Sequence, residues 1–306
     1  MSQLQAKEIE EIRQDLDLFL RSPRTQRPQS IVAKGIGLSG TVISQFISDS
    51  YKGDSAEVAL KVKAYVERER RLSISRKPDI KIVETSVYRR LRDASEFAYD
   101  NKMILAYGNP GIGKTLATMR LAQNDPNIIR IEVIPGLGPN DVLRMVCEAL
   151  KVRFSMTIPS MFEAARDRLT DSGRLILFDE ADYLSIKCFD ILRRLHDLSR
   201  IGILFVGAPA LNFKFRDLQN FKQVDNRIRL RVPLDNITLA DAKKIVTANA
   251  PQCEPIVATF YKAAAGDARR IESLIDAALD LSAKNGKAPF NDELALEAIR
   301  HVDKGE

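Results

Sequence analysis

Apolar residues follow two patterns along this chain. In its middle part, short uninterrupted apolar runs alternate with longer stretches in which apolar residues recur every three or four positions. An uninterrupted run is typical of a strand buried on both faces, and the wider spacing is typical of a helix with one buried face. The alternation therefore predicts an α/β core with a parallel sheet covered by helices. We expect strands over residues 103–107, 128–133, 174–178 and 201–206, and helices over residues 87–99, 115–123, 140–150, 159–169 and 185–199.

The pattern on either side of this core is helical. Residues 4–20 have apolar positions at helical spacing, a break follows over residues 22–28, and amphipathic helices resume after it. After Leu234 we expect helices over residues 238–249, 256–265, 268–284 and 292–302, the first opened by a capping box. The predicted domains are an N-terminal helical domain (1–66), a charged basic linker (67–81), the α/β core (82–233) and a C-terminal helical domain (234–306).

Composition narrows the class of protein. Hydrophobic residues make up 45% of the 306 residues, which is enough to fill cores. No apolar run reaches the roughly 18 residues of a membrane span, so no membrane partner is expected. Cys147, Cys188 and Cys253 are odd in number and far apart, which favours free thiols in a reducing cytoplasm. The formal charge of +6 is compatible with a nucleic-acid partner but is weak support for one.

The loop after the first predicted strand carries the strongest chemical signal. Residues 108–115 match the phosphate-binding pattern G-x-x-x-x-G-K-[ST]. Glycines let backbone N–H groups turn towards phosphate oxygens, and the following helix points its positive end at the same anion. Lys114 is expected to contact the β and γ phosphates, and the Thr115 hydroxyl to ligate Mg²⁺. The predicted ATP-binding residues are Gly108, Asn109, Pro110, Gly111, Ile112, Gly113, Lys114 and Thr115.

Two acids end a second buried strand. Asp179 and Glu180 follow the apolar run 175–178. Because ligands of parallel sheets bind beyond the carboxyl ends of the strands, these acids and the phosphate loop are expected to converge. Asp179 would hold Mg²⁺ through water, and Glu180 would orient the water that attacks the γ-phosphate. The sequence therefore predicts a Mg²⁺-dependent ATPase.

Residues 29–46 resemble the helix-turn-helix of the phage repressor and Cro class. In that resemblance Ala33 lets two helices cross closely, Gly37 supplies the left-handed turn, and Ser39 caps a second helix over residues 40–47. Thr41, Ser44 and Gln45 would face DNA. The alternative is a protein-interaction domain, since this face carries few positive charges. The basic linker after it either touches DNA or is a solvated tether.

A helical lid after a phosphate-loop core resembles the layout of AAA+ ATPases, and more narrowly the transposition proteins B of Mu and Mu-like phages. The matching segments are 51–54, 83–85, 108–115, 179–182, 200–202 and 227–228. That family implies an ATP-dependent, largely nonspecific double-stranded DNA-binding protein in the bacterial host cytoplasm. Its members assemble as homo-oligomers or filaments on target DNA and activate a transposase, and DNA and the transposase stimulate their ATP hydrolysis.

The resemblance also suggests roles for two arginines. Arg227 resembles an arginine finger that reaches the γ-phosphate of a neighbouring subunit, with Arg229 and Arg231 as rivals. Arg269 resembles the lid arginine that contacts phosphate in its own subunit. The chain departs from the AAA+ pattern at Ala208, where a polar residue, commonly Asn, often contacts the attacking water; the nearest polar substitute is Asn212. We therefore expect slow hydrolysis without a partner.

The DNA path through the core is expected along the helix after the second strand, with Arg144, Lys151 and Arg153 as candidates, although a solvated helix face is an equal alternative. Two other functions stay open. A helicase loader would use the same ATPase machinery, but the N-terminal helix-turn-helix favours direct DNA binding. A transcriptional regulator would use that motif to bind one operator, and the ratio of specific to random-DNA affinity separates it from the transposition protein.

Overall fold

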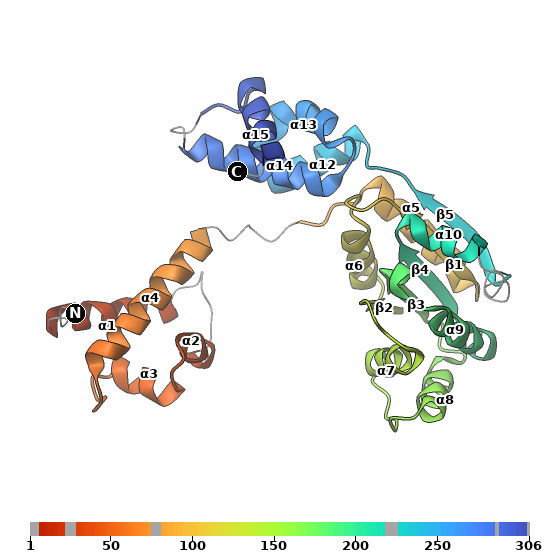
Figure 1. The fold of residues 1–306 in the computed structure, drawn as a ribbon, viewed down its shortest axis with the longest axis horizontal. Helices are drawn as coiled ribbons and strands as arrows, with labels where there is room; N and C mark the ends of the chain where they lie inside the picture. Colours follow the sequence, from red (N-terminus) through yellow and green to blue (C-terminus); the bar gives the residue numbers. More distant parts are fainter. Residues whose placement is uncertain (1–5, 22–28, 75–80, 218–225, 285–287, 305–306) are drawn as a thin grey trace. The chain divides into compact units, whose positions relative to one another are not determined.

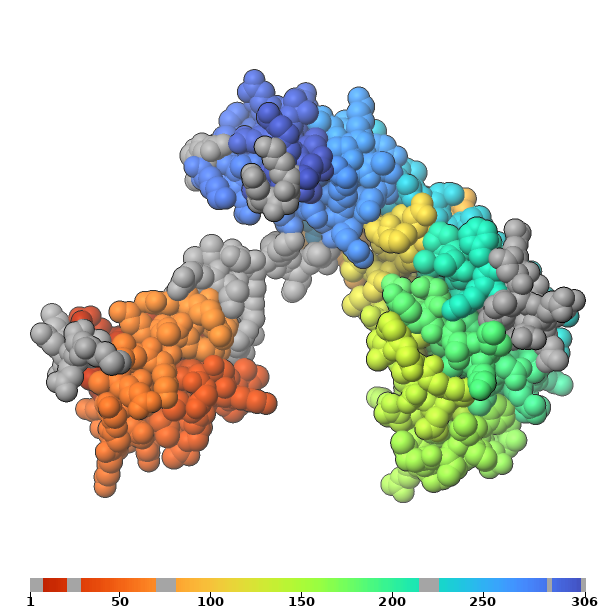
Figure 2. Space-filling view, viewed as in Figure 1, coloured from red at the N-terminus to blue at the C-terminus, as the bar shows by residue number. Residues whose placement is uncertain are grey.

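The computed structural model describes residues 6–21, 29–74, 81–217, 226–284 and 288–304 (Figure 1). The chain divides into two compact units, Met1–Asp79 and Ile80–Glu306. Figure 2 shows the helices after β5, in blue, as a lobe of the second unit beside its α/β part.

Unit 1 is an all-helical domain. It contains α1 (Ala6–Arg21), α2 (Gln29–Ile36), α3 (Gly40–Ile47) and α4 (Ser55–Ile74). The predicted turn is confirmed, because Gly37 has φ +78° and the Ser39 hydroxyl accepts a hydrogen bond from Val42 N at 3.2 Å. α2 and α3 meet at 103°, within the range of helix-turn-helix motifs. Ala33, the small residue predicted at the helix crossing, is buried, and Ile43 and Phe46 of α3 are buried in the same core.

Arg13 fastens α1 to the carboxyl end of α3. Its Nε donates to Phe46 O at 2.7 Å, and its Nη2 donates to Asp49 Oδ1 at 2.6 Å. A cation at the carboxyl end of a helix stabilises the exposed carbonyls there. α1 is therefore an integral part of the unit that presents α3.

The predicted linker over residues 67–81 is wrong in its first half. α4 continues without interruption to Ile74, and Glu69 is only 7% exposed. The charged run predicts a linker between domains, but Glu and Arg are good helix formers and here they extend the helix. Residues 75–80 lie outside the described part of the chain, and Lys81 already belongs to the second unit.

Unit 2 is built on a five-stranded parallel sheet, which confirms the predicted fold class. Its strands are β1 (Met103–Gly108), β2 (Ile128–Glu132), β3 (Leu175–Asp179), β4 (Gly202–Gly207) and β5 (Ile228–Leu234), in the order β2-β3-β4-β1-β5. β5 was not predicted, because Arg229, Arg231 and Pro233 interrupt its apolar pattern. As an edge strand it pairs only with β1 within the described residues, and an edge tolerates both charge and proline.

Helices cover both faces of the sheet (Figure 1). Successive side chains of β1 point to opposite faces: Ile104 and Ala106 join the core with α5 and α6, whereas Met103 and Leu105 join the core with α7, α8 and α9. The helices and short 3₁₀ turn of this part are α5 (Ser86–Tyr99), α6 (Lys114–Asn124), α7 (Pro139–Leu150), α8 (Ile158–Leu169), η1 (Ala181–Tyr183), α9 (Ile186–Ser199) and α10 (Pro209–Asp217).

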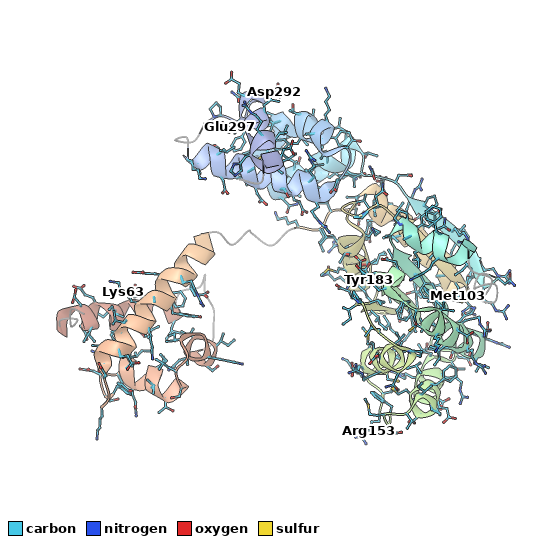
Figure 3. All side chains as sticks on the ribbon, viewed as in Figure 1. Lys63, Met103, Arg153, Tyr183, Asp292 and Glu297 are labelled. Carbon is cyan, nitrogen blue, oxygen red and sulfur yellow. The ribbon has the colours of Figure 1, made fainter. Side chains whose placement is uncertain are left out.

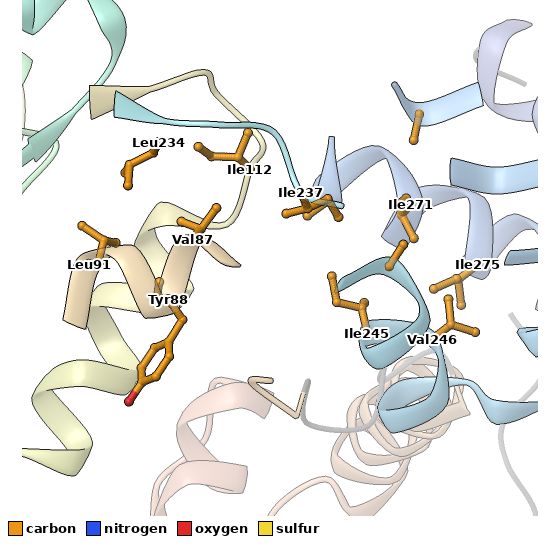
Figure 4. Close-up of a cluster of buried hydrophobic side chains, with 14 of the residues drawn as sticks. Val87, Tyr88, Leu91, Ile112, Leu234, Ile237, Ile245, Val246, Ile271 and Ile275 are labelled. Carbon is orange, nitrogen blue, oxygen red and sulfur yellow. The ribbon is translucent and has the colours of Figure 1, made fainter. Parts of the chain in front are cut away.

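The C-terminal region is helical, as predicted. It contains α12 (Leu239–Asn249), η3 (Pro251–Ile256), α13 (Val257–Ala264), α14 (Ala268–Lys284) and α15 (Asp292–Lys304). Its buried residues are continuous with those of α5 and the phosphate loop, so that Ile112 and Leu234 share one apolar cluster with Ile237 and Ile271 (Figure 4). The helices of the lid therefore pack onto the core through a common interior.

The cysteines and the absence of a long apolar helix were both predicted from composition. All three cysteines are buried and free, as expected. Among the described residues, no single helix is long and apolar enough to span a membrane; α2 and α3 pass that test only as a bent pair, and both contribute to the core of unit 1.

Asp241 joins the start of the lid to the start of α5. Its carboxylate accepts hydrogen bonds from Ser86 N at 2.9 Å, Ser86 Oγ at 2.6 Å and Thr238 N at 3.0 Å, and the residue is 1% exposed. Burial by itself would raise the pKa of Asp241, but the hydrogen bonds from Ser86 and Thr238 outweigh it and hold the pKa below the ordinary value. The carboxylate is thus stabilised in its ionised form.

We expect Asp241→Ala to lower the free energy of unfolding of unit 2 by about 2–3 kcal/mol at neutral pH, because buried donors lose a charged acceptor. A depressed folded-state pKa contributes stability above the unfolded pKa of about 3.9 and loses it as pH falls further. The difference from the unsubstituted protein should therefore shrink below about pH 4. Urea unfolding at several pH values measures this. Asp235→Ala, at an exposed acid nearby, is the matched control and should change stability by less than about 0.5 kcal/mol.

Candidate nucleotide-binding site

The phosphate loop joins the buried strand β1 to the amino end of α6. Gly111 and Gly113 have φ values of +81° and +90°, a region that glycine enters without strain. The Lys114 side chain folds over the loop, where its Nζ donates to Gly108 O and Asn109 O, both at 2.9 Å. Burial lowers the pKa of Lys114, while Glu180, Asp179 and Asp182 act in the opposite direction. This ammonium is therefore held at the loop by carbonyls and faces a group of acids.

A cavity of about 450 Å³ opens between this loop, the end of β3 and the lid. Its volume is within the range of small-molecule sites. It brings together the predicted residues Lys114, Thr115, Glu180 and Arg269. The complete lining is Pro110, Gly111, Gly113, Lys114, Thr115, Leu116, Glu180, Asp182, Tyr183, Ala208, Ala268, Arg269 and Glu272.

Three predicted loop residues lie outside this lining. Gly108 is buried at the end of β1, and a Cβ there would come within 2.6 Å of Leu234 O. Asn109 Nδ2 donates to Asn236 Oδ1 at 3.2 Å, which joins the loop to the segment before the lid. Ile112 is buried and lines a second cavity.

The second cavity adjoins the first, since Gly113, Leu116, Ala268 and Glu272 line both. It is mainly apolar and lies between the segment before α5, the start of α6 and the lid. Lys81 N closes one side of it by donating to Asn249 Oδ1 at 2.8 Å. Its volume of about 30 Å³ has room for about two water molecules, so it is much smaller than the first cavity. The remaining lining residues are Ile82, Val83, Thr85, Ile112, Ala117 and Ile245.

The acids at the end of β3 occupy different environments. Asp179 is fully buried and does not line the cavity, whereas Glu180 lies at its wall. Glu180 has a left-handed backbone with φ +55°, an uncommon conformation for a residue other than glycine and one that clusters at functional sites. Burial, followed by the neighbouring charges of Asp179 and Asp182, raises the pKa of Glu180, and Lys114 partly offsets the rise.

The residues present fit a Mg²⁺ ion bound together with a nucleotide. Mg²⁺ prefers oxygen ligands, keeps several waters, and is usually held by one or two protein groups plus phosphates. The Thr115 hydroxyl at the cavity and the adjacent acids supply such oxygens. Within the described ranges there is no cluster of three or more His, Cys, Asp or Glu side chains that could hold a metal by itself.

The cavity also contains residues that sequence reasoning did not single out. Tyr183 is 47% exposed in η1 and lies at the cavity wall (Figure 3). Asp182 accepts a hydrogen bond from Ala208 N at 3.0 Å and so joins the ends of β3 and β4. Glu272 follows Arg269 by one helical turn. Of these, only Asp182 had a sequence signal, because it belongs to the acidic motif 179–182.

Asn212 does not replace the polar residue missing at position 208. Ala208 lines the cavity, whereas Asn212 is buried away from it and accepts a hydrogen bond from Arg231 Nη1 at 2.6 Å. Within the described chain, the position next to β4 therefore contributes an apolar side chain to the site.

Arg227 is not brought to the cavity of its own subunit. It precedes β5, and the register Met103↔Ile228 and Gly108↔Leu234 places it at the sheet edge opposite the phosphate loop. Its Nε donates to Asp197 Oδ1 at 2.8 Å. Its role as an arginine finger stays a prediction.

The predicted DNA-contacting residues lie in two separate places. Thr41, Ser44 and Gln45 are exposed on α3 of unit 1. In unit 2, Arg144 is paired on α7 with Asp141 at 3.4 Å and Glu148 at 3.9 Å. Lys151 and Arg153 are exposed in the segment between α7 and α8, and Figure 3 labels Arg153 there. Their contact with DNA stays a prediction.

Gly111→Ala is expected to weaken ATP binding by about 10- to 100-fold, because a left-handed backbone strains any other residue by about 1–3 kcal/mol. The added Cβ would also lie 2.3 Å from Asp267 Oδ1, and it would force apart the loop and the lid that hold each other through Arg269 N and Gly111 O. Equilibrium binding of a fluorescent ATP analogue measures the loss.

A double variant separates these two causes. Asp267→Ser shortens the opposing side chain but keeps an acceptor for Arg270 N at the start of α14. Added to Gly111→Ala, it should recover part of the lost affinity. Wild-type affinity in Gly111→Ala itself would show that the loop and lid do not close on the nucleotide in this way.

Several known proteins are similar to this chain. An AAA domain profile matches residues 98–215. The chain is 27% identical over 248 residues to the ATP-dependent target DNA activator B of Escherichia phage Mu, an alignment that covers 78% of each chain. It is 26% identical over 189 residues to the DNA transposition protein B of the Mu-like prophage FluMu in Haemophilus influenzae, covering 60% of this chain and 65% of that one.

Solved structures of low sequence identity share the fold. Cdc6p from Pyrobaculum aerophilum superimposes with a TM-score of 0.56 at 14% identity, covering 73% of this chain and 67% of that one. The ORC2 protein of Aeropyrum pernix superimposes with a TM-score of 0.53 at 17% identity, covering 70% and 66%. At such identities the similarity supports the fold alone.

Proposed function

This chain is an AAA-domain homologue of the transposition proteins B of Mu-like phages, and from that relationship we propose that it is an ATP-dependent activator of target DNA. In this proposal it binds double-stranded DNA largely without sequence preference while it holds ATP. It assembles with copies of itself on the DNA, delivers that DNA to a transposase and activates the transposase. ATP hydrolysis then ends the DNA-bound state.

The convergence of loop, acid and lid in one cavity is the observation that carries the proposal. Lys114 and Thr115 come from α6, Glu180 from the end of β3, and Arg269 from α14, yet all four line the same space. An anion placed there meets a lysine, an arginine and the amino end of a helix. The triphosphate of a nucleotide fits this space.

The residues at the cavity then have distinct roles in hydrolysis. Glu180 accepts a proton from water as that water attacks the γ-phosphorus, and the bond from the γ-phosphorus to the β–γ bridging oxygen breaks. Lys114 and Arg269 offset the negative charge of the phosphates. Thr115, with Asp179 behind it, would hold the Mg²⁺, which neutralises charge on the phosphate oxygens when bound. Hydrolysis is slow in this proposal because Ala208 offers no polar group to the attacking water.

Unit 1 supports direct contact with DNA. The capped helix α3 exposes Thr41, Ser44 and Gln45, which suit contacts to phosphates and base edges. The same face carries few cations, so additional affinity would come from the basic residues Arg144, Lys151 and Arg153 of unit 2. Affinity distributed over many copies of the chain favours binding without sequence preference, since phosphate contacts carry no sequence information.

The proposal is tested by binding to a random-sequence duplex with ATP, with ADP and without nucleotide, while particle size is followed in the same samples. Tight binding that needs ATP, in assemblies that grow with DNA length, is the expected result. Lys114→Ala should lose both properties. Lys102→Ala, at a partly exposed lysine just before β1 and outside both cavities, should keep them. Nucleotide-independent binding by a small species, selective for one sequence, would replace this proposal with a transcriptional regulator. Absence of DNA binding in every state would favour a helicase loader.

A further inference from the structure

Arg130 occupies a position behind the nucleotide cavity that the proposed mechanism leaves unexplained. It lies on β2, which pairs with β3 so that Glu132 is level with Asp179. Its Nη2 is 2.7 Å from Asp179 Oδ2, and its side chain is only 16% exposed. An arginine of the neighbouring strand is therefore paired with the buried acid of the ATPase motif.

Both carboxylate oxygens of Asp179 have hydrogen-bond partners. Oδ1 accepts a hydrogen bond from Glu180 N at 3.1 Å. Oδ2 receives Arg130 Nη2, and it also lies 2.8 Å from Thr118 Oγ1. Because β2, α6 and the chain after β3 each supply a donor, the orientation of this carboxylate is fixed from three sides.

Thr118 extends the network to the cavity. Arg130 Nε donates to Thr118 Oγ1 at 3.0 Å, and that hydroxyl lies 2.9 Å from Thr115 O as well as beside Asp179. Thr115 is the predicted Mg²⁺ ligand and lines the cavity. The guanidinium of Arg130 thus contacts both Asp179 and Thr118, the two side chains that lie behind the predicted Mg²⁺ ligand Thr115.

The pairing also changes the charge below the cavity. Asp179 is fully buried, and a buried carboxylate without a partner is strongly disfavoured. Arg130, which also pairs with the half-exposed Glu132 at 3.0 Å, offsets part of that charge, so that a cation at Thr115 would face a paired carboxylate rather than a lone one. This weakens the attraction for the cation and at the same time gives Asp179 one orientation.

We propose that Arg130 is a positioning residue for the Mg²⁺-dependent hydrolysis of ATP, acting through Asp179 and Thr118. This inference rests on the proposed ATPase function. Arg130 weakens the binding of the cation but fixes the geometry of the cation site. Its removal therefore has two effects of opposite direction: Mg²⁺ binds more tightly, and the bound nucleotide is hydrolysed more slowly.

Arg130→Gln tests both effects. The turnover number at saturating Mg²⁺ should fall about 10- to 100-fold, since small misplacements of a catalytic group have effects of that size. The Mg²⁺ concentration that half-saturates tight binding of a fluorescent ATP analogue should fall about threefold or more, because a negative charge near the site is no longer offset. The second measurement does not depend on activity. General damage to the fold would raise that concentration instead.

Arg130→Lys distinguishes the effect of charge from the effect of geometry. It also replaces Arg130→Gln as the test if Arg130→Gln does not unfold cooperatively on heating. Lysine keeps the positive charge but has no Nε group for Thr118. The half-saturating Mg²⁺ concentration should stay at the wild-type value, while the turnover number should still fall severalfold. Glu148→Gln is the control. Glu148 is exposed on α7 and lies outside the cavity lining, so both quantities should be unchanged.

Either of two results would overturn the inference: a wild-type turnover number in the arginine variants, or a raised half-saturating Mg²⁺ concentration in a folded Arg130→Gln protein. A wild-type protein that neither binds nor hydrolyses ATP in the presence of Mg²⁺ would instead overturn the proposed function itself.

Discussion

An Arg227→Ala variant is expected to bind ATP as tightly as the wild-type protein and to lose about a thousandfold of its hydrolysis rate on DNA, as arginine fingers do in comparable enzymes. Arg227 lies at the sheet edge away from its own phosphate loop, so in the proposed role it would act on a nucleotide held by a neighbouring copy. Steady-state hydrolysis on a long duplex, with ATP binding to the DNA-free protein measured in parallel, separates the two properties.

Mixing two inactive variants tests action between subunits. A Lys114→Ala subunit keeps Arg227, and an Arg227→Ala subunit keeps a working phosphate loop. Their mixture should therefore regain part of the activity that each lacks alone. Arg229→Ala is the matched control on the same strand and should retain most of the rate. If Arg229→Ala is the more damaging substitution, or if the mixture stays inactive, Arg227 is not the finger.

The second large effect is expected for Glu180→Gln, which should reduce the turnover number by about 10²- to 10³-fold, the usual contribution of a general base. Glutamine keeps the shape of the side chain at the cavity wall but cannot accept the proton of the attacking water. ATP binding should persist, and the ATP-dependent complex with DNA should consequently last longer than that of the wild-type protein. Single-turnover hydrolysis and the dissociation rate from DNA measure the two results.

The pH dependence supplies a further check on the same residue. The raised pKa of Glu180 means that the carboxylate becomes protonated at a higher pH than an ordinary glutamate, whose pKa is about 4.3. Because the base must be ionised, the wild-type rate should decline as pH falls through that raised pKa. This decline should be missing from Glu180→Gln and retained in Glu148→Gln, a variant of an exposed glutamate on α7. A Glu180→Gln protein with a wild-type rate would assign the base to another group.

Local patterns in the sequence were sufficient for most of the fold and for part of the site. The phosphate loop lies between a buried strand and a helix, so residues 108–115 could be identified from adjacent positions alone. The acids at the end of β3 follow from the same logic. β5 could not be predicted, because an edge strand half exposed to solvent carries arginines and a proline in place of an apolar run.

The contacts that buried polar groups make likewise could not be predicted from the sequence. Arg130 contacts Asp179 only because β2 and β3 are neighbours in register, a pairing that no local pattern specifies. Tyr183 reaches the cavity because η1 turns immediately after Glu180. Arg269 was assigned from a resemblance, and its place in the cavity depends on the lid packing onto the loop. Long-range pairing, rather than residue type, decides these positions.

The apolar cluster shared by α5, the phosphate loop and the C-terminal helices has a consequence for truncation. Removing residues 235–306 would take away Ile237, Ile245 and Ile271 and leave Leu234, Ile112 and Val87 facing water (Figure 4). The α/β part of the structure thus ends at residue 234, but a chain that ends there would lack part of its apolar core. Such a shortened chain would expose an apolar surface and aggregate. Fusions and insertions should therefore be made elsewhere, so that the α/β part and the C-terminal helices stay together as one folding unit.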